Sequence, residues 1–192
     1  MPKILCSRRQ FIASLSFTAP LALVGLIGPA HASSPDSDAA LMKKFNYLNE
    51  NGNSNCSGKF MKSIATMPAG ARLQGSCCAP MDAHRYVEQV RALRKYSAAS
   101  DIPPDPYDVS AELAQKLMAY YDGPLSNTEQ TAYDFAMKNS DENGPCCCKC
   151  WRWHVYGGLG KYLVHEKAFD GPQLVEVWNL SSGCGGGAEH HH

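Results

Sequence analysis

The sequence lacks several features that would place it in a common functional class. Its 18 Lys and Arg residues balance its 18 Asp and Glu residues, and no basic tract or basic–aromatic stripe occurs, so we expect no nucleic-acid partner. The glycines between Gly157 and Gly160 lack the strand and helix context of a phosphate-binding loop. Beyond the N-terminal region, no apolar run approaches the length of a membrane-spanning helix. The paired Cys-x-x-Cys motifs of a zinc ribbon are also absent.

The first 32 residues have the pattern of an export signal. Residues 7–12 (SRRQFI) fit the twin-arginine motif, an apolar run follows at 19–27, and Ala30-His31-Ala32 is a small-x-small cleavage site. Proline and glycine interrupt the apolar run, which makes it a poor membrane anchor. We therefore expect cleavage after Ala32 and a periplasmic or otherwise exported protein without membrane contact. The twin-arginine route carries folded proteins, many of which acquire a metal or cofactor first.

Cleavage would leave residues 33–192, a length that suits one domain. Lys3, Arg8 and Arg9 would leave with the signal, so that 15 basic residues would face 18 acidic ones. We expect the polar ends at 33–38 and 183–192 to be mobile. The terminal His190–His192 is either native or the remnant of a tag, and we exclude it from the site.

Apolar residues recur at helical spacing along most of the mature chain. This periodicity predicts an all-α fold, a small single-domain helical bundle of about five or six short helices with long loops. Ser126 and Glu129 form a capping-box pattern, and Pro145 is well placed to open a helix. No run alternates as a strand would. The expected helices cover 39–49, 82–97, 110–121, 127–138, 145–165 and a short segment from 171, with 59–67 as a further candidate.

Cysteine is the most informative residue of the mature chain, which holds eight of the nine. Four lie at 146–150 and two at 77–78. If 145–165 is helical, Cys146, Cys150 and His154 lie one turn apart on one face, and the helix N-terminus favours thiolates. Cys78 and Met81 have the same relation at i, i+3. The expected metal ligands are Cys77, Cys78, Met81, Cys146, Cys147, Cys148, Cys150, His154 and Cys184.

Thiolate and thioether ligands select Cu(I), zinc or iron–sulfur clusters. Met81 beside cysteines and the excess of thiols over four favour Cu(I), which the protein would store, buffer or deliver. Four thiolates, or three with His154, would also hold zinc. Iron–sulfur clusters fit less well, because neither ferredoxin spacing is present. The expected partners are a metal ion and another periplasmic metalloprotein.

Two alternatives need no metal. Eight cysteines in an oxidising compartment suit a disulfide framework, in which 146–150 would pair with Cys56, Cys77, Cys78 and Cys184. Such a chain would be a structural or binding protein. A thiol–disulfide oxidoreductase is the enzymatic alternative, although a Cys150–His154 pair lacks an evident orienting group.

The segment Pro145-Cys146-x-Cys148-x-Cys150 resembles the signature of the PCYCGC-motif proteins, exported bacterial proteins of no established function. Residues 133–137 resemble the family's approach to the motif, and 183–185 its C-terminal cysteine region. Cys147 stands where the family has Tyr, and Lys149 where it has Gly. The resemblance covers the last third of the chain and implies export and cysteine-based metal or redox chemistry, without a particular activity.

Overall fold

The computed structural model describes residues 37–185, within the unit Ser33–His192. The expected signal at 1–32 and His190–His192 lie outside the described residues. A small, predominantly helical domain is confirmed, although residues 37–185 contain seven α-helices rather than five or six, because the candidate at 59–67 forms one of them. None of these helices is long and apolar enough to span a membrane. The helices are α1 (Asp38–Asn51), α2 (Gly58–Ile64), α3 (Ala83–Leu93), α4 (Ala111–Tyr121), α5 (Asn127–Asn139), α6 (Trp151–Glu166) and α7 (Gly171–Ser181).

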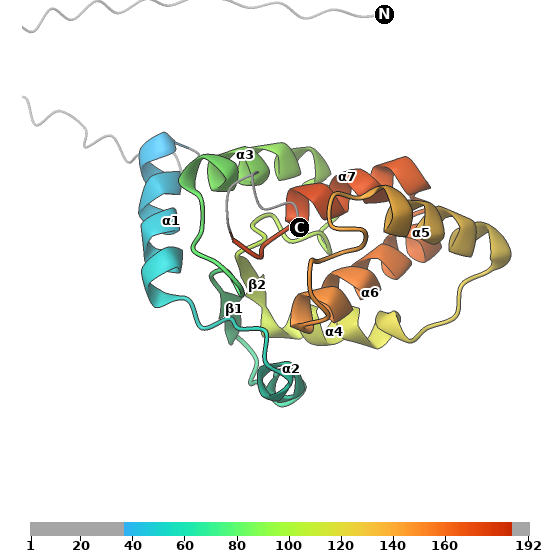
Figure 1. The fold of residues 1–192 in the computed structure, drawn as a ribbon, viewed down its shortest axis with the longest axis horizontal. Coiled ribbons are helices and arrows are strands. Elements are labelled where there is room, and N and C mark those ends of the chain that lie inside the picture. The colour runs from blue at the N-terminus through green and yellow to red at the C-terminus, as the bar shows by residue number, and fades with distance from the viewer. Residues whose placement is uncertain (1–36, 186–192) are drawn as a thin grey trace, which may run out of the picture. The chain divides into compact units, whose positions relative to one another are not determined.

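Helix α6 forms the centre of the larger core. Figure 1 shows it between α4 and α7, with α5 beside them. Val155, Tyr156, Gly157 and Gly158 are consecutive and all buried. Because successive residues point about 100° apart, this is the pattern of a helix surrounded by protein. A Cβ atom at Gly158 would lie 2.8 Å from the carbonyl carbon of Leu117 in α4. Glycine at this position therefore lets the backbone of α4 approach α6 closely.

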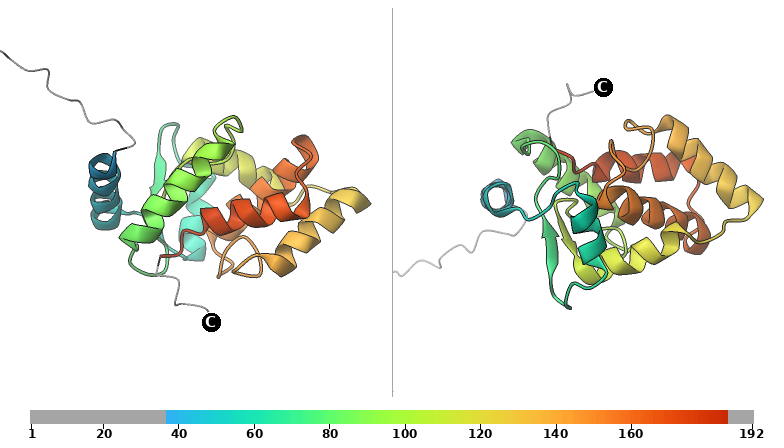
Figure 2. Two further views of the ribbon diagram at one scale, coloured as in Figure 1. Left: turned by 90° about the horizontal axis from the view of Figure 1, so that it is seen from above. Right: turned by 60° about the horizontal axis from the view of Figure 1, so that its bottom comes forward.

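A second, smaller core lies between α1 and α3, which Figure 2 shows beside each other. Phe45 of α1 contacts Tyr86 of α3 with ring centroids 5.7 Å apart, and Tyr86 contacts Tyr107 at 5.9 Å. Met81 is buried in the same cluster. Helix α1 begins at Asp38, with Ser37 as its cap, so the expected mobile leader at 33–38 includes the helix start.

Two three-residue strands, β1 (Arg72–Gln74) and β2 (Asp108–Ser110), pair antiparallel with Leu73 opposite Val109. Three residues are too few to show an alternating pattern, which is why the sequence did not reveal them. Lys44 and Arg72 both form ion pairs with Asp108. The sheet helps to position Cys77 and Cys78, because the segment that contains them begins two residues after the end of β1 at Gln74.

The observed helix caps agree with the cap residues in the sequence. Ser126 and Glu129 form the expected capping box at the start of α5. Asp170 and Gln173 form another at the start of α7, with Pro172 in its first turn. Helix α3 begins after its cap, Asp82, and a 3-10 turn, η1 (Arg94–Tyr96), continues it.

Candidate metal centre

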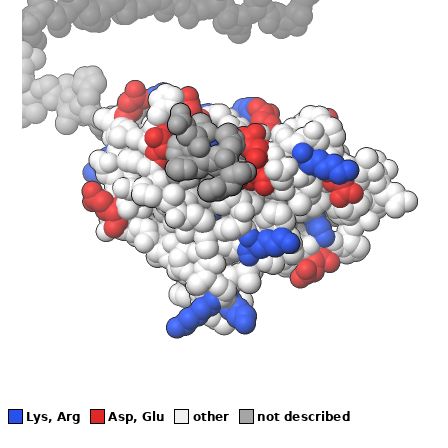
Figure 3. Space-filling model, in the orientation of Figure 1, with Lys and Arg blue, Asp and Glu red and all other residues white. Residues whose placement is uncertain are grey.

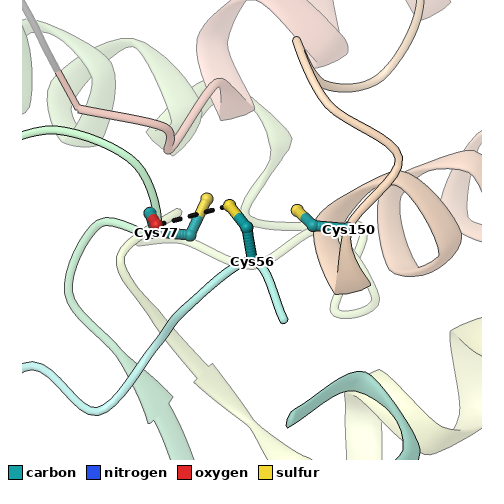
Figure 4. Close-up of side chains that lie close together, drawn as sticks. All are labelled: Cys56, Cys77 and Cys150. Carbon is teal, nitrogen blue, oxygen red and sulfur yellow. Dashed lines mark hydrogen bonds between the residues drawn. The ribbon is translucent and has the colours of Figure 1, made fainter. Parts of the chain in front are cut away.

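Eight thiols from four separate segments converge between the helices. Cys56 lies between α1 and α2, Cys77 and Cys78 between β1 and α3, Cys146–Cys150 supply four between α5 and α6, and Cys184 follows α7. We call this set, Cys56, Cys77, Cys78, Cys146, Cys147, Cys148, Cys150 and Cys184, the eight-thiol cluster. Figure 4 shows three of its members, from three of the segments, close together.

The two sequence clusters meet, as expected. The Sγ atoms of Cys78 and Cys148 lie 3.7 Å apart. Cys56 Sγ lies 2.9 Å from that of Cys78 and 3.4 Å from that of Cys148. Cys56 was missing from the expected ligands, because it stands alone in a loop. The only sign in the sequence that it belongs to the site is that it completes an even number of cysteines.

The expected helix from Pro145 is wrong in its first turns. Helix α6 begins at Trp151, and Cys150 is its N-cap with extended backbone. Asn143 and Gly144 have positive φ angles of 51° and 144°, and residues 145–150 continue as bends. Successive side chains on a helix point about 100° apart. In a helix, the consecutive residues Cys146, Cys147 and Cys148 would therefore point in three different directions. The irregular backbone lets all four thiols reach one region.

Residues 77–79 are also not helical, so Cys78 and Met81 do not share a helix face. The backbone amides of Cys78 and Ala79 both donate to the carbonyl of Cys184, at 3.2 and 2.9 Å. Cys184 is itself only 6% exposed. Its Sγ lies 3.0 Å from those of both Cys146 and Cys147. Residues 183–185, expected to be mobile coil, are thus tied to the cluster.

Two expected ligands are placed elsewhere. Met81 packs among the apolar residues of the smaller core. The ring of His154 stacks edge-on against Tyr121, with centroids 4.5 Å apart. In residues 37–185, every group of three or more candidate Cys, His, Asp or Glu ligands consists of cysteines only, so the structure does not bring His154 to the thiols.

The eight thiols are free. The Sγ atoms of Cys56 and Cys78, for example, lie 2.9 Å apart, well above the ~2.05 Å of a disulfide bond. They form five groups of three whose sulfur atoms all lie within 4.8 Å of one another. The cluster can therefore hold a metal ion. The groups are Cys56–Cys77–Cys150, Cys56–Cys78–Cys148, Cys77–Cys78–Cys184, Cys146–Cys147–Cys184 and Cys146–Cys148–Cys150.

A buried cation lies beside the cluster. Arg152 is 1% exposed, and its Nη1 and Nη2 donate to the carbonyls of Pro106 and Gly75 at 2.6 and 3.0 Å. Its guanidinium also lies over the rings of Trp151 and Tyr107. No ion pair between described residues includes it, and its Nε has no hydrogen-bond partner. A buried charge without an acidic partner is costly, so a nearby anion would stabilise it.

The thiols influence each other's protonation. Hydrogen bonds, first from Cys146 and then from Cys77, lower the pKa of Cys184 to about 3, against burial and with help from Cys147 and Arg152. Hydrogen bonds with Cys146 and Cys150 lower the pKa of Cys77 to about 6.

Other thiols shift in the opposite direction. Burial raises the pKa values of Cys56, Cys78 and Cys147, and the hydrogen bond with Cys150 raises that of Cys146 most. The cluster thus stabilises a few thiolates, whereas complete deprotonation requires added positive charge.

The cluster is accessible from solvent at one edge. Cys78 and Cys147 are exposed, and Cys77 and Cys78 line a surface hollow of about 400 Å³ together with Asn49 and Ser76. On the described part of the face in Figure 3, acidic and basic side chains are interspersed and neither sign forms a continuous patch.

Comparison with known proteins does not assign the chain to a family. No protein-family model matches it, and no solved structure matches it. A local similarity, 26% identity over 73 residues, links it to a sphingomyelinase C of Leptospira interrogans. That similarity involves 31% of this chain, which spans only 13% of the length of the relative.

Proposed function

We propose that this protein binds Cu(I) through the eight-thiol cluster and stores, buffers or delivers it outside the cytoplasm. The observation that carries the proposal is the donor set, in which every candidate ligand group of the described chain consists of thiols alone. Thiolates are soft ligands that favour Cu(I), zinc and iron–sulfur clusters over hard cations. Eight convergent thiols also exceed the four that one structural zinc ion takes.

The size of the groups supports Cu(I) over zinc. A tetrahedral site with Zn–S bonds of ~2.3 Å requires four sulfurs spaced about 3.8 Å apart in every pair. In residues 37–185, the groups within 4.8 Å of one another have three members, and none has four. Three thiolates suit trigonal Cu(I) coordination. Iron–sulfur clusters fit less well because neither ferredoxin spacing is present in the sequence.

Two sequence features support the proposed location. The twin-arginine pattern at 7–12 and the cleavage site at 30–32 are typical of exported proteins. The resemblance of 145–150 to the PCYCGC-motif proteins points the same way. The proposed partner is another periplasmic metalloprotein, to which exposed Cys78 would present copper by ligand exchange.

The test is an anaerobic titration of the reduced protein with Cu(I), supplied as its acetonitrile complex, against a competing chelator. We expect more than one tightly bound copper per chain and displacement of zinc by Cu(I). A parallel alkylation experiment counts free thiols before and after chelation. Binding of fewer than about 0.2 copper equivalents by the reduced protein would overturn the proposal, and a complete lack of alkylatable thiols in the protein as isolated would support a disulfide framework.

A thiol–disulfide oxidoreductase is the second candidate. The observation that favours it is the 2.9 Å distance between Cys56 Sγ and the Sγ of exposed Cys78. A small movement of this pair would bring the two sulfurs to the ~2.05 Å of a disulfide bond. The candidate predicts turnover in a disulfide-exchange assay that Cys78→Ser abolishes, whereas the copper proposal predicts no turnover in either protein.

A further inference from the structure

We infer that the eight-thiol cluster binds its copper as one polynuclear Cu(I)–thiolate centre, in which most of the cysteines bridge two ions. The inference rests on the proposed function and deepens it, because it makes a set of Cu(I) ions, rather than a single ion, the cargo of the site. A thiolate sulfur has lone pairs enough to bind two Cu(I) ions. A sulfur can therefore bridge two ions only if the fold places it in two different groups of neighbouring thiols.

The fold does so for seven of the eight thiols. Each of these seven belongs to two of the five three-thiol groups, and only Cys147 belongs to one. Cys184, for example, joins Cys77 and Cys78 in one group and Cys146 and Cys147 in another. Shared members connect all five groups into a single network. Without sharing, eight thiols make at most two complete groups of three, whereas shared thiolates can hold up to five ions.

The charges around the network fit an anionic centre. Each thiol releases its proton on binding metal, so eight thiolates with five Cu(I) ions carry a net charge of −3. A buried centre with that charge requires a nearby cation. Arg152 is buried and has no acidic partner in the described ion pairs. A Cβ on Gly183, the residue before Cys184, would lie 2.8 Å from its Nη2, so the unpaired guanidinium is adjacent to the network.

Two exposed cysteines provide a matched test. Cys78 belongs to two groups and Cys147 to one. We expect the Cys78→Ser protein to bind two Cu(I) ions fewer than wild type and the Cys147→Ser protein one fewer. Copper is counted by elemental analysis after anaerobic loading and exposure to a chelator that strips Cu(I) from a two-thiol peptide. Circular dichroism of both metal-free variants confirms that they fold.

X-ray absorption of the loaded wild-type protein supplies an independent readout. A bridged centre shows a short copper–copper distance in addition to copper–sulfur scattering, and separate sites show only the latter. Equal losses of at most one ion from both variants, together with no copper–copper scattering, would overturn the polynuclear centre while leaving Cu(I) binding intact. A wild-type protein that binds no copper would instead overturn the proposed function, and this inference with it.

Discussion

Replacement of Gly158 by alanine should destabilise the protein, because α4 and α6 touch backbone to backbone at this residue. The added Cβ would overlap the Leu117 carbonyl oxygen, lie 2.8 Å from its carbon and lie 3.2 Å from the Tyr121 amide nitrogen. No rotamer change relieves contacts with backbone atoms. Since carbon atoms pack best at ~3.5–4.0 Å, the two helices must separate by roughly 1 Å. Overpacking of a core typically lowers the free energy of unfolding by about 1–3 kcal/mol or more. The higher helix propensity of alanine offsets about 1 kcal/mol of this loss.

We therefore expect a net loss of about 2 kcal/mol for Gly158→Ala. Urea and thermal unfolding measure it, with a fall in Tm of roughly 4–8 °C for a domain of this size. Gly157→Ala is the matched control, because its Cβ meets the ring of Tyr121, a side chain that can move, and it should lose less. A Gly158→Ala protein as stable as wild type would refute the close approach of α4 and α6.

Two further predictions concern charged residues. Burial opposes ionisation of Asp108, but Arg72 and Lys44 outweigh it and lower its pKa. The carboxylate therefore stabilises the fold above its unfolded pKa of ~3.9 and loses this effect as pH falls through its lower folded value. Asp108→Asn should cost about 1 kcal/mol at pH 7 and less at pH 3, and equal costs in urea melts at both pH values would contradict this. Arg152→Met should weaken Cu(I) retention at least tenfold in a chelator competition, since a unit charge at ~10 Å contributes roughly 1.7 kcal/mol at an effective dielectric constant of ~20. Arg152→Lys should retain most of the affinity, and equal loss in both variants would indicate a packing role.

Local signals in the sequence located most of the fold. The capping box of Ser126 and Glu129 marked the start of α5 because it depends on residues three apart. Asp170 marked the start of α7 in the same way. Strands β1 and β2 escaped notice because three-residue strands depend on pairing between distant segments, such as Leu73 with Val109. Their formation follows from tertiary packing rather than from local preference.

The site was predictable in composition but not in geometry. Thiol density identified the cysteines, yet helical spacing suggested His154 as a ligand, and the backbone of 145–150 is not helical. Pro145 lacks an amide hydrogen, and this suits a loop as well as a first helical turn. Cys56 was missed because its approach to Cys148 joins residues 92 apart in the sequence. Only the packing of α1, α2 and α6 around the larger and smaller cores brings these loops together.

The same long separations link metal binding to folding. Cys77 and Cys184 are 107 residues apart, so the five thiol groups exist only when α3, α6 and α7 have packed. A metal bound to the folded state alone stabilises it by mass action. In an oxidising compartment, however, the 2.9 Å separation of Cys56 and Cys78 sulfurs favours a disulfide that would remove both from the network. If the chain folds and loads metal before export by the proposed twin-arginine route, the reducing cytoplasm would keep the eight thiols free, and the bound ions would then occupy the sulfurs that would otherwise oxidise.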